Sequence, residues 1–223
     1  LKRVFVAFDT RYDRVMLIKE NNVYLPILDH FRQGKKRVLV AGSTYAADEE
    51  ILKKIWDLEL LDGLVIVPHE INPTRMEQLE KIFDGQFQKA SDLGENTSLA
   101  AEAKILVIDQ YGLLSKAYRF GNISYVGGGF NRGIHNVLEA AVYGKPVVFG
   151  PKHSRFVEAE RLIEAGGAIS IDSAEDFMEW MIDKAEHDDQ LTKMGHQASM
   201  HIQLHTGGTQ RVLLEISKIL AIS

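Results

Sequence analysis

A glycine-rich segment carries the clearest potential for chemistry in this chain. It begins with Gly127-Gly128-Gly129 directly after an apolar run, adds Gly133, and continues through His135, Asn136 and Glu139. Glycines at the end of a strand let the backbone approach a phosphate closely, and the start of the following helix favours an anion. We therefore expect a flexible loop that is aimed at an anionic ligand.

Two roles compete for Glu139. Asn136 and Glu139 have the spacing of a capping box, in which each side chain satisfies the other's end of a helix turn. A carboxylate in the first turn of such a helix is also able to accept both hydroxyls of a ribose, because it has two acceptor oxygens. Capping does not explain the glycines or Gly133-Ile134-His135, so the residues favour the ribose role.

Four further segments follow apolar runs and carry candidate binding residues. Each also has a simpler interpretation as a helix cap, a turn or a solvated loop. The candidates are Gly42, Ser43 and Thr44, followed by acidic residues; Pro68 and His69; Tyr111, Gly112 and Leu113; and the cationic Lys152 and Arg155. The cationic pair suits a phosphate or carboxylate partner.

The elements that must position these residues alternate between strand and helix. Short apolar runs predict strands at 4–8, 38–41, 64–67, 105–108, 123–126 and 147–149, with weaker candidates at 168–171 and 86–89. Amphipathic patterns predict helices at 48–61, 72–83, 112–119, 136–143, 156–165, 174–186 and 209–220. Residues 92–97 are expected to form a loop. This order predicts an α/β fold with a Rossmann-like, doubly wound parallel sheet, in a single domain over residues 1–223. Ligands of such sheets bind at the carboxyl ends of the strands.

Composition excludes several classes of protein. The 223 residues carry a net charge of -5 and no cysteine, so neither a basic nucleic-acid-binding face nor a thiolate metal site is expected. Dinucleotide, Walker, nucleophile-elbow and paired-histidine zinc patterns are absent, and we expect no metal and no cofactor. No apolar run reaches the length of a membrane span, and no signal peptide precedes residue 4, which suggests a cytoplasmic setting. The start without Met suggests a fragment of a longer protein.

The motifs together resemble a known family. Gly42-Ser43-Thr44, Pro68-His69, the glycine segment through Asn136, Leu138 and Glu139, and Gly144-Lys145-Pro146 with Gly150-Pro151 occur in the order found in 3-deoxy-D-manno-octulosonic acid (Kdo) transferases. The resemblance is to the C-terminal half of these enzymes and spans nearly the whole chain.

The resemblance implies the C-terminal half of a GT-B glycosyltransferase, which binds the nucleotide sugar CMP-Kdo. An N-terminal domain, absent from this chain, then binds a lipid A precursor and supplies the catalytic base at the cytoplasmic face of the inner membrane. The implied nucleotide-binding residues are Gly42, Ser43, Thr44, Pro68, His69, Tyr111, Gly112, Leu113, Gly128, His135, Asn136, Val137, Leu138, Glu139, Lys152 and Arg155. The implied reaction is inverting and metal-independent.

The chain departs from the family pattern at four positions. It has Tyr45 where a histidine is common, His69-Glu70 where arginine often follows the proline, Leu113 in place of glutamate, and Arg155 in place of asparagine. Two alternatives therefore remain beside Kdo transfer. One is a GT-B transferase or epimerase that uses a UDP-sugar, and the other is a non-catalytic nucleotide-binding domain.

Overall fold

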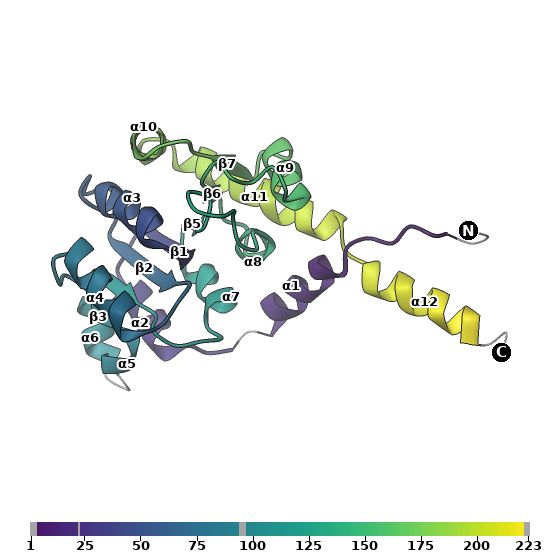
Figure 1. Ribbon diagram of the computed structural model, residues 1–223, viewed down its shortest axis with the longest axis horizontal. Helices are drawn as coiled ribbons and strands as arrows, with labels where there is room; N and C mark the ends of the chain where they lie inside the picture. The colour runs from purple at the N-terminus through teal and green to yellow at the C-terminus, as the bar shows by residue number, and fades with distance from the viewer. Residues whose placement is uncertain (1–3, 22, 94–96, 221–223) are drawn as a thin grey trace.

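The computed structural model describes residues 4–21, 23–93 and 97–220. Within them, seven parallel strands form one sheet in the order β3-β4-β2-β1-β5-β6-β7 (Figure 1). The strands are β1 (Val38–Thr44), β2 (Gly63–Pro68), β3 (Gln88–Lys89), β4 (Ile105–Val107), β5 (Ile123–Val126), β6 (Val147–Phe149) and β7 (Ala168–Ser170). The predicted α/β class with a doubly wound parallel sheet is therefore confirmed.

Helices cover both faces of the sheet. They are α1 (Thr10–Glu20), α2 (Pro26–Arg32), α3 (Ala46–Trp56), α4 (Pro73–Ile82), α5 (Ala90–Leu93), α6 (Thr97–Glu102), α7 (Leu114–Ala117), α8 (Leu138–Ala141), α9 (Val157–Glu164), α10 (Ala174–Ala185), α11 (Asp188–Leu204) and α12 (Gly208–Leu220), with a short 3-10 turn at Tyr118–Phe120. Successive strand residues point to opposite faces, and each face is buried. Val38 and Val40 of β1 pack in one core with α1, α2, α8 and α9, while Leu39 and Ala41 pack in the other with α3, α4 and α10.

The sheet has a switch point between β1 and β5. On one side of β1 lie β2, β4 and β3, and on its other side lie β5, β6 and β7. Gly42 of β1 lies opposite Val126 of β5, so these two central strands end beside each other. In doubly wound sheets this is where a crevice for a ligand opens. The glycine-rich segment leaves the sheet at this point.

Several expected elements differ from the structure. Residues 4–8 form no strand; Val4 and Val6 are 74% and 76% exposed, because the segment pairs with no neighbouring strand. Helix α8 is shorter than the helix expected at 136–143. Asn136 precedes it, and the side chain of Asn136 accepts a hydrogen bond from the N–H of Leu138, the first residue of the helix. Ala90–Leu93 is a helix where residues 92–97 were expected to form a loop, and residues 94–96 lie outside the described part.

Besides α5, the helices α1, α2, α6 and α11 were not predicted from the sequence, and α11 is the longest of them. Its buried positions include the small residues Gly195 and Ala198, which carry little hydrophobic signal. A Cβ on Gly195 would lie 2.2 Å from the carbonyl oxygen of Gly144, so glycine permits close contact between α11 and the turn after α8. Of the others, α6 has only six residues, and α1 and α2 each bury only two side chains.

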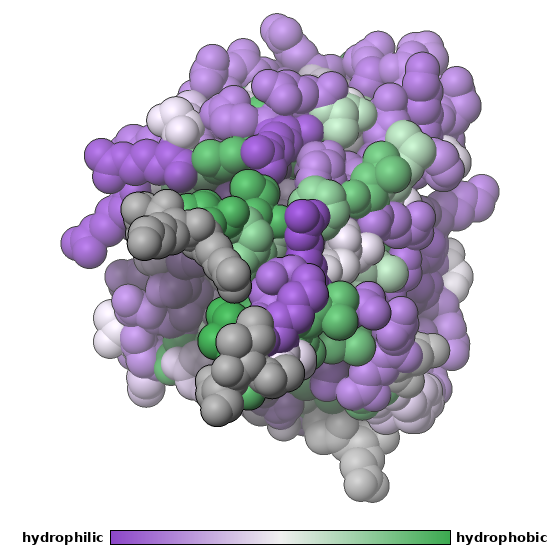
Figure 2. All heavy atoms as spheres, turned by 90° about the vertical axis from the view of Figure 1, so that its right-hand side faces the viewer, coloured by the Kyte–Doolittle hydropathy of each residue, from purple (hydrophilic) through white to green (hydrophobic). Residues whose placement is uncertain are grey.

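The two ends of the described chain lie on one side of the molecule. The segment before α1 and helix α12 extend away from the sheet together (Figure 1). Asp13 of α1 accepts hydrogen bonds from the backbone N–H groups of Gly207 and Thr209, both at 2.6 Å, and so caps the start of α12. Figure 2 shows hydrophobic side chains gathered on this face. The segment before α1 and helix α12 carry exposed hydrophobic residues such as Phe5, Leu213 and Leu220. No helix in the described part of the chain has both the length and the apolar character that crossing a bilayer requires.

We predict that His201 on α11 makes the fold sensitive to mild acid. Burial, with the nearby His205 and Arg161, lowers the pKa of His201 to about 4 from its ordinary 6.5. As the pH falls from about 6.5 to about 4, His201 is protonated in the unfolded chain before it is protonated in the folded chain. The stability that neutral, buried His201 gives to the fold is therefore present above this pH range and is lost within it. The melting temperature of the His201→Gln variant should fall less than that of the wild type between these pH values. The exposed His196→Gln is the matched control on the same helix and should follow the wild type; equal acid sensitivity of all three proteins would contradict the prediction.

Candidate functional site

The glycine-rich segment is closely packed at the switch point. A Cβ on Gly127 would lie 2.4 Å from the carbonyl oxygen of Ser43, and a Cβ on Gly129 would lie 2.5 Å from the Cα of Gly150. Gly128 has a φ of 94°, in the left-handed region that favours glycine. All three glycines are buried. Instead of an open flexible loop, the segment is a tight turn that holds the exits of β1, β5 and β6 together.

Asp48 in the first turn of α3 is the polar centre of this turn. Its Oδ1 accepts a hydrogen bond from the Tyr125 hydroxyl at 2.8 Å, and its Oδ2 accepts from the backbone N–H groups of Gly128 at 3.0 Å and Tyr45 at 2.9 Å. Asp48 is fully buried. Burial, followed by the charge of Asp48, raises the pKa of Tyr125, which keeps its hydroxyl protonated as a donor. In the sequence, Asp48 is only one of several acidic residues near a predicted helix start.

A second buried acid fixes the exit of β1 on the other side. Glu49 accepts a hydrogen bond from the Thr44 hydroxyl at 2.7 Å and forms an ion pair with Arg75 of α4. Burial raises the pKa of Glu49, and Arg75 opposes that change. Thr44 is thus a structural link at this position, while Ser43 beside it adopts a φ of 53° where the β1–β2 register shifts. Gly42 is required because the Tyr118 hydroxyl and Leu114 would lie 2.2 Å and 2.3 Å from a Cβ there.

The segment from Asn136 to Glu139 follows the glycine turn. Asn136 accepts a hydrogen bond from the Leu138 N–H at 3.2 Å and donates to Glu139 Oε1 at 3.0 Å. The second oxygen of Glu139, and the N–H groups of Asn136 and Val137, have no hydrogen-bond partner in the part of the chain that the structure describes. Burial raises the pKa of Glu139, with Asn136 and Arg14 acting in the opposite direction. Asn136 and Glu139 are half-buried, so this short segment offers a ligand one donor and one acceptor, whereas Val137 and its N–H are fully buried.

The cationic turn after β6 lies beside the glycine segment. Lys152 donates to the carbonyl oxygen of Asn131 at 2.6 Å and so helps to hold the glycine turn. His153 contacts Glu160 at 2.8 Å. Arg155 is exposed and makes no hydrogen bond or ion pair with the described residues, so its charge is available to an anion.

The remaining predicted residues lie at the exits of β2 and β4. His69 is exposed after Pro68, and its backbone N–H donates to the Thr44 carbonyl at 3.0 Å. Its ring stacks on that of His135, with centroids 4.4 Å apart. Tyr111, Gly112 and Leu113 follow β4 and lead into α7, whose Leu114 lies next to Gly42 near the end of β1.

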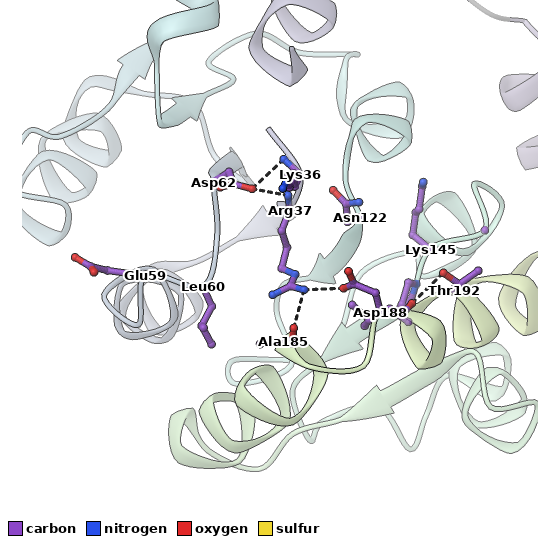
Figure 3. Close-up of a pocket in the computed structure, with 13 residues that line it drawn as sticks. Lys36, Arg37, Glu59, Leu60, Asp62, Asn122, Lys145, Ala185, Asp188 and Thr192 are labelled. Atoms are coloured by element: carbon purple, nitrogen blue, oxygen red, sulfur yellow. Dashed lines mark hydrogen bonds and ion pairs between the residues drawn. The ribbon is translucent and has the colours of Figure 1, made fainter. Parts of the chain in front are cut away.

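A cavity lies at the opposite edge of the sheet. It has a volume of about 660 Å³ and is lined by residues at the amino ends of the strands, including Arg37, Asp62, Asn122 and Pro146 (Figure 3). Two of its charged groups already have partners: Arg37 contacts Asp188 at 2.6 Å, and Asp62 accepts two backbone hydrogen bonds. The carboxyl ends of the strands, where doubly wound sheets bind ligands, remain the better candidate. Among the described residues, no three His, Asp or Glu side chains are grouped to hold a metal ion.

Comparisons with known proteins show which proteins the chain is similar to. No family model matches the chain. Among curated proteins, the chain is 33% identical over 141 residues to the 3-deoxy-D-manno-octulosonic acid transferase of Aquifex aeolicus, which covers 60% of this chain and 37% of that enzyme. The corresponding Rickettsia bellii enzyme is 28% identical over 158 residues, covering 66% and 37%. This chain is similar to the Kdo transferases. A bifunctional glycosyltransferase/methyltransferase of Fusobacterium nucleatum is 33% identical over 148 residues, or 65% of this chain and 23% of that protein. The chain thus spans 23% to 37% of the length of these relatives.

Solved structures support the fold. The C-terminal CMP-Kdo binding domain of WaaA from Acinetobacter baumannii matches with a TM-score of 0.59 and 20% identity, covering 84% of this chain and 96% of that domain. HepE from Anabaena, in complex with UDP-glucose, also has a TM-score of 0.59 at 12% identity, covering 99% of this chain and 57% of that protein. The predicted fold, that of the C-terminal half of a GT-B glycosyltransferase, is confirmed.

We predict that loss of the Asp48 carboxylate destabilises the whole turn. Asp48→Ala leaves the buried Tyr125 hydroxyl and the Gly128 N–H without an acceptor, which should lower the free energy of unfolding by about 2–4 kcal/mol. Urea denaturation measures this loss. Glu50→Ala, an exposed acid in the same helix turn, is the control and should change stability little. Equal stability of the two variants would show that Asp48 does not hold the turn.

Proposed function

We propose that this chain is the donor-binding half of a Kdo transferase and that it binds CMP-Kdo. The observation that carries the proposal is the segment from Gly127 to Glu139, which leaves the sheet at its switch point with an unpaired N–H on Asn136 and an unpaired carboxylate oxygen on Glu139. The similarity to Kdo transferases supports the choice of cytidine nucleotide and of Kdo as the sugar.

In this proposal each part of the site has one task. The N–H group of Asn136 binds the phosphate, and Arg155 adds positive charge from the neighbouring turn. Glu139 accepts the ribose hydroxyls. Its raised pKa in the free chain reflects burial, and hydrogen bonds from the two hydroxyls favour its charged form when the nucleotide is present.

The complete enzyme then transfers Kdo to a lipid A precursor in lipopolysaccharide synthesis. A carboxylate base on the N-terminal domain removes the proton of an acceptor hydroxyl. The resulting oxygen attacks the anomeric carbon of Kdo from the face opposite the phosphate, and CMP leaves with the bonding electrons, so the configuration inverts. This chain's residues stabilise the charge that grows on the departing phosphate, without a metal ion. The reaction takes place at the cytoplasmic face of the inner membrane.

A UDP-sugar is the second candidate donor. The structural likeness to HepE, which was solved with UDP-glucose, favours it, since Glu139 and the glycine turn suit the ribose of either nucleotide. A nucleotide-binding domain without catalysis is the remaining alternative, suggested by Glu70, Leu113 and Arg155 where the family pattern has other residues.

Calorimetry with CMP and UDP tests the proposed donor. The chain should bind CMP more tightly than UDP, and Glu139→Gln should weaken CMP binding about tenfold or more, because a charged acceptor of two hydroxyls is lost. Glu164→Gln, at the end of α9, is the matched control and should bind like the wild type. Tighter binding of UDP would favour the UDP-sugar alternative, and binding of neither nucleotide would favour a domain that has lost this function.

We also predict that residues 1–223 alone transfer no sugar. The chain supplies donor contacts but not the base that activates the acceptor. An assay with CMP-Kdo and a lipid A precursor should therefore give no product with this chain, although CMP binds. Transfer at a measurable rate would place the base within these residues and contradict the proposed division of tasks.

A further inference from the structure

Three aromatic rings from separate parts of the sequence meet at the switch point. Tyr45 follows β1, His69 follows β2, and His135 follows the glycine turn. The ring centroids of His69 and His135 are 4.4 Å apart with an interplanar angle of 28°, and those of Tyr45 and His69 are 4.9 Å apart. The Tyr45 hydroxyl lies 3.3 Å from His135 Nε2. Parallel strand order brings these residues together, and their sequence spacing does not indicate it.

Charge on His135 is disfavoured in the free chain. Burial, followed by the neighbouring His69, lowers the pKa of His135, and the charge of Asp48 partly opposes this. Among the described residues, Glu70 and Arg132 also face the cluster and act in opposite directions on the pKa of Tyr45. The two imidazole rings are 4.4 Å apart, so one anion is able to contact both, and a negative charge there favours a proton on the pair.

The cluster also adjoins the free donor described above. His135 directly precedes Asn136, whose backbone N–H has no partner in the described residues. An anion on that N–H therefore lies next to the His135 ring. His69 occupies the position where arginine often follows the proline in the resembling family, so the chain has a titratable group in place of a permanent cation.

We propose that His69 and His135 act as one anion-binding unit that takes up a proton when the phosphate of the donor nucleotide binds. This inference rests on the proposed function, because it concerns the same site. In the complex the pair carries an added proton that the phosphate stabilises. The affinity for the nucleotide therefore rises as the pH falls, by up to about tenfold per pH unit for one proton taken up.

Isothermal titration calorimetry of the 223-residue chain tests the inference. The probe is the methyl ester of CMP, because a phosphodiester keeps a single charge across the titration. It is measured from about pH 6 to about pH 8 in two buffers of different ionisation enthalpy, a range that brackets histidine titration. We expect uptake of about one proton and a matching increase in affinity at lower pH.

Three variants separate proton uptake from ring stacking. His69→Phe keeps an aromatic ring and should lose both the proton uptake and the pH dependence, as should His135→Asn. His153→Asn, in the cationic turn, removes a histidine outside the cluster and should retain both. Binding by His69→Phe that matches the wild type at every pH would overturn the inference and assign the cluster to stacking.

A measurement on the wild type alone guards against variants that fold poorly. In NMR titrations the pKa of His69 or His135 should rise when the methyl ester of CMP is bound. Nucleotide binding without a rise in either pKa and without proton uptake overturns this inference alone. Absence of binding at every pH overturns the proposed function as well.

Discussion

The buried carboxylate of Asp48 is the interaction on which the rest of the site depends. It joins three parts of the chain that parallel strands bring side by side: the β1–α3 turn through Tyr45, strand β5 through Tyr125, and the glycine turn through Gly128. Because these donors satisfy it within the protein, the carboxylate fixes the path of the glycine turn instead of binding ligand. That fixed path places the segment from Asn136 to Glu139 beyond the turn, where its remaining donor and acceptor are available.

Much of the fold was predictable because buried parallel strands leave a strong signal. Five of the six apolar runs expected to form strands lie in the sheet, as do the two weaker candidates, since strands covered on both faces consist mostly of β-branched and aliphatic residues. The run at 4–8 has the same composition but no neighbouring strand, and composition alone does not distinguish the two cases. Helix α11 was missed for the opposite reason, because its contacts rely on Gly195 and Ala198 rather than on large apolar side chains.

The site was predictable in its location but not in its internal contacts. Strand ends and glycines pointed to the segment from Gly127 to Glu139, and the structure places it at the switch point. The meeting of Tyr45, His69 and His135 depends on the order β2-β1-β5, which no local pattern specifies. Asp48 looked like an ordinary helix-start acid, because its donors lie 77 and 80 residues away in the sequence.

The central claim is that a cytidine nucleotide binds where β1 and β5 part. A crystal structure of this chain with CMP tests it most directly. The account predicts the phosphate at the N–H group of Asn136 beside His135, with the ribose hydroxyls on Glu139. CMP bound instead in the cavity near Arg37 at the amino ends of the strands, with Glu139 contacting only Asn136, would contradict it.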